Sequence, residues 1–167
     1  MKFLCDQHRT LLQQSPTLAQ ARWQEWMASG YQAMAEREWP RAISYYGCCY
    51  EVSEWQLRAE IQESATCNLK SLDQVMIAGH LLAESFGRSG NIPMERHCLL
   101  AVHNRLTALA TNFLDPDQAS RLRNNIELSL AMLKRHCKLH GDFGAMHACV
   151  QLTRSILNDL PISAALH

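Results

Sequence analysis

The chain has 167 residues, and its 16 Lys and Arg residues balance its 16 Asp and Glu residues. Proteins that bind nucleic acid usually carry excess positive charge, because contacts to phosphates dominate their affinity, so we expect no nucleic-acid partner. No run approaches the roughly 20 apolar residues that a membrane-spanning helix needs, and polar residues interrupt the apolar start of the chain. The sequence therefore predicts a cytoplasmic protein without a membrane segment.

Helix-start signals divide the first half of the chain. Residues 3–14 form a short amphipathic run, and Ser15-Pro16 supplies the residue types of a helix N-cap and first helical position. Apolar side chains then recur every three or four residues to about Glu36, which predicts one amphipathic helix. Pro40 opens the next helix, and the sequence to residue 69 allows either one long helix or two shorter ones.

The second half carries similar signals. Ser71 and Gln74 have the spacing of a capping box, Asp115-Pro116 repeats the N-cap and proline pair, and the last helix is expected over 145–157. No segment alternates apolar and polar residues over strand length, so we predict an all-α protein with about seven helices and no sheet. The expected organisation is one domain over 1–160, with an N-terminal helix at 1–15, helix pairs at 16–69, 71–112 and 115–158, and a flexible tail at 161–167.

Three turns between expected helices share one pattern. Each has a polar or glycine corner, then a large apolar residue near the start of the next helix. The corner reverses the chain, and the apolar residue packs the new helix onto the old one. This recurrence predicts stacked antiparallel helix pairs. The turns are Arg37-Glu38-Trp39-Pro40, Gly90-Asn91-Ile92-Pro93 and Gly141-Asp142-Phe143-Gly144.

Small and aromatic residues also recur at matching helix positions. They are Trp26, Ser29, Gly30, Ala42, Tyr46 and Cys49 in the first pair, Leu82, Ala83, Phe86 and Gly90 in the second, and Gly141-Asp142-Phe143 in the third. This arrangement resembles the tetratricopeptide repeat (TPR) family. Corresponding turn residues lie 53 and 51 positions apart, whereas that family repeats about every 34 residues, so longer helices are expected. The resemblance implies a short right-handed TPR-like solenoid.

In the TPR family the first helix of each pair lines a concave groove that binds a protein or peptide. The resemblance implies a groove that is apolar and aromatic at one end and basic at the other, which suits an amphipathic helix or an extended peptide with an acidic end. We therefore expect a non-catalytic scaffold or adaptor. The alternatives are a homo-oligomerising module, such as a homodimer, and a regulatory or sensing domain that binds a metal through Cys and His. The expected groove residues are Met27, Tyr31, Met34, His80, Glu84, Arg88, Arg135 and Lys138.

Motifs for catalysis and metal binding are weak. The sequence has no glycine-rich phosphate loop, no Gly-x-Ser-x-Gly element and no His-Glu-x-x-His, so we expect no enzyme activity and no cofactor. The seven cysteines are an odd number and are expected to be free thiols. Cys and His recur three residues apart, a spacing that shares one helix face. We expect no bound metal, and the first quartet to test for one is Cys5, His8, Cys137 and His140.

Overall fold

The computed structural model describes residues 2–63, 71–111 and 115–160, and all regular secondary structure in these ranges is helical. Seven helices, with no strand in the ranges described, confirm the prediction of an all-α protein. The helices are α1 (Asp6–Gln13), α2 (Pro16–Ala35), α3 (Trp39–Glu63), α4 (Ser71–Arg88), α5 (Ile92–Leu109), α6 (Pro116–His140) and α7 (Phe143–Asp159).

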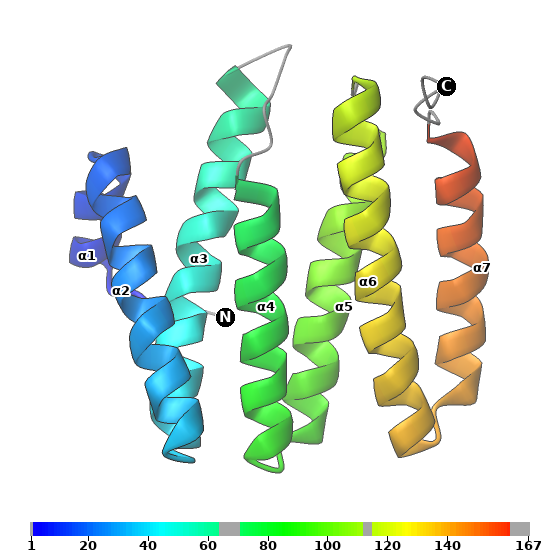
Figure 1. Cartoon of the computed structure of the whole chain (residues 1–167), viewed down its shortest axis with the longest axis horizontal. Coiled ribbons are helices and arrows are strands. Elements are labelled where there is room, and N and C mark those ends of the chain that lie inside the picture. The colour runs from blue at the N-terminus through cyan, green and yellow to red at the C-terminus, as the bar shows by residue number, and fades with distance from the viewer. Residues whose placement is uncertain (1, 64–70, 112–114, 161–167) are drawn as a thin grey trace.

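The helices form a row in which each packs against the next along the chain (Figure 1). Polar side-chain contacts also join helices that are two apart. These contacts place α2, α4 and α6 in one layer and α3, α5 and α7 in the other. The contacts link Gln20 to Gln74 and Asp73 to Asn125 in the first layer, and Glu54 to Arg105 and His103 to Thr153 in the second.

The three turns that share a sequence pattern also share a backbone conformation. Arg37, Gly90 and Gly141 have φ angles of 59°, 82° and 75°, in the left-handed region. In each turn the following N–H donates to a carbonyl five residues earlier, at 2.8, 2.9 and 2.9 Å in chain order. This is the 6→1 hydrogen bond of a Schellman motif, which reverses the chain tightly after a helix. All three turns lie at the same end of the helices, along the lower edge of Figure 1.

The helix starts follow the capping signals, with two corrections. The Ser15 hydroxyl caps α2, and Asp115 forms a full capping box at the start of α6. The expected capping box at Ser71 is wrong, because Ser71 is itself the first residue of α4 and its hydroxyl donates to Glu60 Oε1 at 2.9 Å. The last helix begins at Phe143 rather than at residue 145, directly after the turn.

Two boundaries differ from or refine the sequence expectation. The first helix begins at Asp6 rather than residue 3, because the backbone N–H groups of Phe3 and Leu4 are bound to Glu51 on α3 and Cys5 is extended. The segment that begins at Pro40 is one continuous helix through Glu63, which decides between one helix and two for that range. Residues 64–70 and the expected tail at 161–167 lie outside the described residues.

Buried apolar side chains form a core that runs along the row. One cluster surrounds Tyr46 and Leu82, and a second surrounds Leu57, Leu106 and Ile126. Tyr46, Leu57 and Leu106 are each 0% exposed. Because burial of one large apolar side chain contributes about 1.5–3 kcal/mol, these clusters hold the two layers together. No helix in the described ranges is long and apolar enough to cross a membrane.

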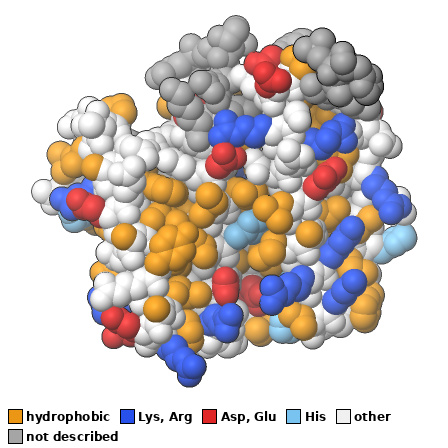
Figure 2. Space-filling view, in the orientation of Figure 1, with side chains coloured by type: hydrophobic (Ala, Val, Ile, Leu, Met, Phe, Trp, Pro, Cys, Tyr) orange, Lys and Arg blue, Asp and Glu red, His pale blue; other side chains and the backbone are white. Residues whose placement is uncertain are grey.

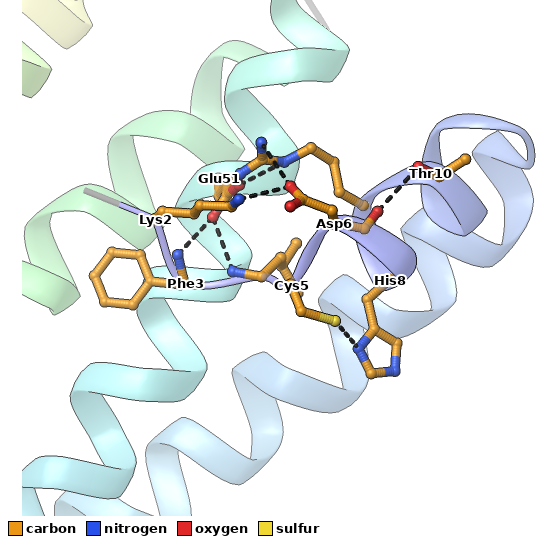
Figure 3. Close-up of polar contacts among 9 residues, drawn as sticks. Lys2, Phe3, Cys5, Asp6, His8, Thr10 and Glu51 are labelled. Carbon is orange, nitrogen blue, oxygen red and sulfur yellow. Dashed lines mark hydrogen bonds and ion pairs between the residues drawn. The ribbon is translucent and has the colours of Figure 1, made fainter.

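The segment before α1 is held on α3 by one carboxylate (Figure 3). Glu51 accepts hydrogen bonds from the backbone N–H groups of Phe3 at 2.7 Å and Leu4 at 3.0 Å, and it pairs with Arg9. Burial alone would raise the pKa of Glu51, but these bonds and the Arg9 charge outweigh burial and hold the pKa below its usual value. The N-terminal segment is therefore fixed by an ionised side chain.

Candidate functional site

A cleft opens where three helices meet near the turns. It has a volume of about 380 Å³ and lies between the second half of α4, the start of α5 and the last turns of α6. On this face hydrophobic side chains gather over α2 and α4, Lys and Arg side chains gather over α6, and acidic and His side chains lie between them (Figure 2). The polar residues that line the cleft are His80, Glu84, Arg88, Glu95, Arg135, His136 and His140.

Helical periodicity places the polar side chains of α4 in the cleft. His80, Glu84 and Arg88 are four residues apart, so they form one stripe along the helix. Arg88 pairs with Glu84 at 3.1 Å. Across the cleft on α6, Arg135 is exposed and forms no ion pair with any acidic residue that the structure describes. Within the described ranges, the positive charge of Arg135 on α6 is therefore unpaired. It lies opposite the α4 stripe, in which the charges of Glu84 and Arg88 neutralise each other.

Glu95, His136 and His140 form a compact group that we call the acid–histidine cluster. Glu95 Oε2 lies 3.3 Å from His136 Nδ1 and 3.9 Å from His140 Nε2, and the two rings have centroids 4.6 Å apart. The His136 side chain is only 3% exposed. The 3.3 Å approach lacks hydrogen-bond geometry, so the buried His136 Nδ1 has no hydrogen-bond partner among the described residues. A buried polar atom in this state is costly, which marks the cluster as a candidate ligand site.

His80 adds a third imidazole to the wall of the cleft. Burial, with a smaller contribution from His103, lowers the pKa of His80 to about 4. His80 is therefore neutral at physiological pH, and one ring nitrogen keeps a lone pair. Its Nε2 is buried without a hydrogen-bond partner in the described part of the chain.

Four of the eight expected groove residues line the cleft, and a fifth, Tyr31, is exposed on α2. Tyr31 is 53% exposed on α2, and its ring meets Tyr46 edge-on with centroids 5.9 Å apart. This contact fixes the Tyr31 ring on the surface, where it offers an aromatic anchor. The other four residues line the cleft itself: His80, Glu84, Arg88 and Arg135.

The remaining three expected groove residues lie elsewhere. Met27 is 5% exposed and belongs to the central core cluster, because its position on α2 faces α3. Met34 is half-buried, and its sulfur accepts a hydrogen bond from Ser85 Oγ at 3.3 Å between α2 and α4. Lys138 is exposed on α6 and does not line the cleft. Met27 and Met34 therefore serve packing in this structure.

The expected metal quartet does not come together. Cys5 Sγ lies 3.1 Å from His8 Nδ1 on the exposed surface at α1, whereas Cys137 and His140 are on α6, far along the row. Cys137 is buried, which raises the pKa of its thiol. The group that does converge among the described residues is the acid–histidine cluster. The sequence shows that His136 and His140 are four residues apart and therefore share one helix face, but it does not show that Glu95, on a different helix, lies beside them.

Comparison with known protein families places the chain in one of them. The family described as "Protein of unknown function (DUF2753)" matches residues 21–167. The chain belongs to the DUF2753 family. No curated protein and no solved structure matches the chain. The part that matches DUF2753 contains the whole cleft and the acid–histidine cluster.

A second cleft of this DUF2753 protein lies between α1, α3 and α5 and has a volume of about 520 Å³. The N-terminal segment, which precedes the range matched by DUF2753, forms part of its wall. The Arg and Glu side chains that line it are paired: Arg9 pairs with Glu51, and Glu54 pairs with Arg58 and with Arg105 outside the cleft. These pairs leave the second cleft less charge for a ligand than the cleft at α4–α6.

Proposed function

We propose that this protein is a non-catalytic TPR-like module that binds a protein or peptide segment on the face formed by α2, α4 and α6. Two features of the fold support a TPR-like solenoid: consecutive antiparallel helices in two layers, and three turns with the same left-handed corner. The helices of a pair are joined by a tight turn, as the resemblance implies. The long helices, up to 25 residues, account for the wide spacing of the turns.

The observation that carries the proposal is the open cleft, together with the exposed aromatic ring of Tyr31 on α2. A volume of about 380 Å³ accommodates a few side chains of a bound segment. Tyr31 supplies an apolar contact toward α2, and Arg135 supplies a positive charge on α6. A segment with apolar residues followed by an acidic end matches this order, because each part meets its complement.

A peptide selection tests the proposal directly. Peptides from a displayed library that bind the full chain are expected to combine apolar and acidic residues. Arg135→Glu and Tyr31→Ala are each expected to weaken these peptides by about tenfold or more, as a lost interface anchor typically does. Lys138→Glu is the matched control, because it reverses a charge on the same helix outside the cleft. If no peptide is enriched, or if Lys138→Glu weakens binding as much as Arg135→Glu, the proposed face is wrong.

Self-association is the alternative use of an exposed apolar surface. On α7, the last helix described, the apolar side chain of Leu152 is 62% exposed. Two such faces brought together would remove apolar surface from water. Light scattering distinguishes this alternative, since a homodimer through α7 gives twice the monomer mass and returns to monomer in Leu152→Glu.

A further inference from the structure

We propose that Glu95, His136 and His140 bind a divalent transition-metal ion, with Zn²⁺ as the representative case. The acid–histidine cluster supplies one carboxylate and two imidazoles, with all three ligand atoms within 4.8 Å of one another. Imidazole nitrogen suits Zn²⁺, Ni²⁺, Cu²⁺ and Co²⁺ better than Mg²⁺ or Ca²⁺, which prefer oxygen ligands. This inference does not depend on whether the cleft binds a peptide.

Two of the three distances between ligand atoms are close to those of a bound site, and the third is within 4.8 Å. In a tetrahedral zinc site with bonds of about 2.0–2.1 Å, neighbouring ligand atoms are about 3.3 Å apart. Glu95 Oε2 lies 3.3 Å from His136 Nδ1 and 3.9 Å from His140 Nε2. His140 is 33% exposed and belongs to the last turn of its helix, so its side chain has room for the small remaining movement.

The unpartnered nitrogen of His136 points to a missing ligand. The His136 side chain is more than nine-tenths buried, its Nδ1 faces the Glu95 carboxylate, and no described residue completes a hydrogen bond to it. The carboxylate beside this nitrogen is itself only 20% exposed, and its charged neighbours in the described cluster are the two imidazoles, which are cations only when protonated. A metal ion would accept the lone pair of the nitrogen and neutralise the carboxylate at once.

The fold also makes room for the carboxylate. Gly87 on α4 faces Glu95 so closely that an added Cβ would lie 2.8 Å from Glu95 Oε2. The glycine therefore lets Glu95 lie between α4 and α6 rather than extend into solvent. Three protein ligands leave at least one coordination position open, and all three ligand residues line the cleft that also contains His80 and Arg135. A water or an anionic group of a partner can complete the coordination there.

Metal titration of the full chain tests the site. We expect Co²⁺ to bind as a single ion per chain with visible d–d absorption, Zn²⁺ to displace it, and Mg²⁺ to leave the spectrum unchanged. His140→Ala and Glu95→Gln are each expected to weaken Zn²⁺ binding by more than about 100-fold, since even outer-shell residues of metal sites contribute about 10–100-fold. Because His140 is partly exposed, His140→Ala keeps the fold, which circular dichroism of the metal-free chain verifies.

Two more variants distinguish this site from metal binding elsewhere on the chain. The double variant Cys5→Ser/His8→Ala removes the exposed Cys–His pair at α1 and should leave Zn²⁺ affinity unchanged. Gly87→Ala keeps all three ligands but displaces the carboxylate, so it should weaken Zn²⁺ binding while leaving a single site. Absence of Co²⁺ absorption in the unaltered chain, or Zn²⁺ affinity that depends on Cys5 and His8 and not on His140, would overturn the proposal.

Discussion

The turn at Arg37 gives a quantitative test of the shared turn conformation. Arg37 has a φ of 59°, and a side chain in the left-handed region costs about 1–2 kcal/mol. Replacement by glycine removes this cost but adds freedom to the unfolded chain, which offsets about 0.5–1 kcal/mol. We therefore expect Arg37→Gly to raise the free energy of unfolding by about 0.5–1 kcal/mol.

The other two turns allow the reverse experiment. Gly90 and Gly141 have φ angles of 82° and 75°, and an added Cβ at either position would meet no atom within 4 Å. The effect of alanine there comes from backbone conformation alone. We expect Gly90→Ala and Gly141→Ala each to lower the free energy of unfolding by about 1 kcal/mol. Arg37→Ala should change it little, because both residues carry a Cβ.

Thermal and urea unfolding followed by circular dichroism measures all four variants. For a chain of this size, 1 kcal/mol shifts the Tm by about 2–4 °C, so the expected differences exceed the precision of the method. Arg37 is exposed, which keeps loss of side-chain packing out of the comparison. A lower Tm in Arg37→Gly, or an unchanged Tm in both glycine-to-alanine variants, would refute the assignment of one turn conformation to all three positions.

Two further predictions concern the core and the N-terminal segment. Leu106 is 0% exposed, so Leu106→Ala is expected to lower the free energy of unfolding by about 2–5 kcal/mol. Leu139 is 69% exposed, so Leu139→Ala should change the free energy of unfolding by less than about 0.5 kcal/mol. Urea unfolding of the two variants measures both effects. Because the folded pKa of Glu51 is depressed, its stabilisation is present above the unfolded pKa and is lost as the pH falls through the folded value. Release of the N-terminal segment in acid should therefore change Trp55 fluorescence, since Arg9 stacks 5.9 Å from that ring, and Glu51→Gln should show the released signal at neutral pH.

Capping and turn residues in the sequence predicted the helices because the ends of a helix are set by hydrogen bonds between residues that are close in the sequence. Asp115-Pro116 caps α6 as its sequence indicates, and the glycine corners adopt the left-handed conformation that few other residues reach easily. Arg37 stands in such a corner without being glycine, and the repeated pattern around it identifies the turn. The predicted capping box at Ser71 is wrong because the Ser71 hydroxyl donates to Glu60, which is 11 residues away and outside the local spacing that defines a capping box.

The candidate site was only partly predictable, since it depends on which helices become neighbours. The stripe of His80, Glu84 and Arg88 follows from periodicity, and these residues do line the cleft. The sequence also contains the four-residue spacing of His136 and His140, but the Cys–His pairs favoured a quartet that the fold separates. Glu95 reaches the histidines only through the packing of α5 against α6, which no local pattern encodes.

The turns and the cleft are linked by the antiparallel order of the helices. The turn at Gly90 joins the end of α4 to the start of α5, and the turn at Gly141 follows the end of α6, so both lie at the same end of the helices. Arg96, next to Glu95, pairs at 2.7 Å with Asp142 in the turn at Gly141, and this pair ties α5 to that turn. The cleft therefore lies where two left-handed corners fix the ends of three helices. A change at Gly141 should consequently alter ligand affinity at the acid–histidine cluster as well as stability, whereas Arg37→Gly, at the distant turn between α2 and α3, should alter stability alone.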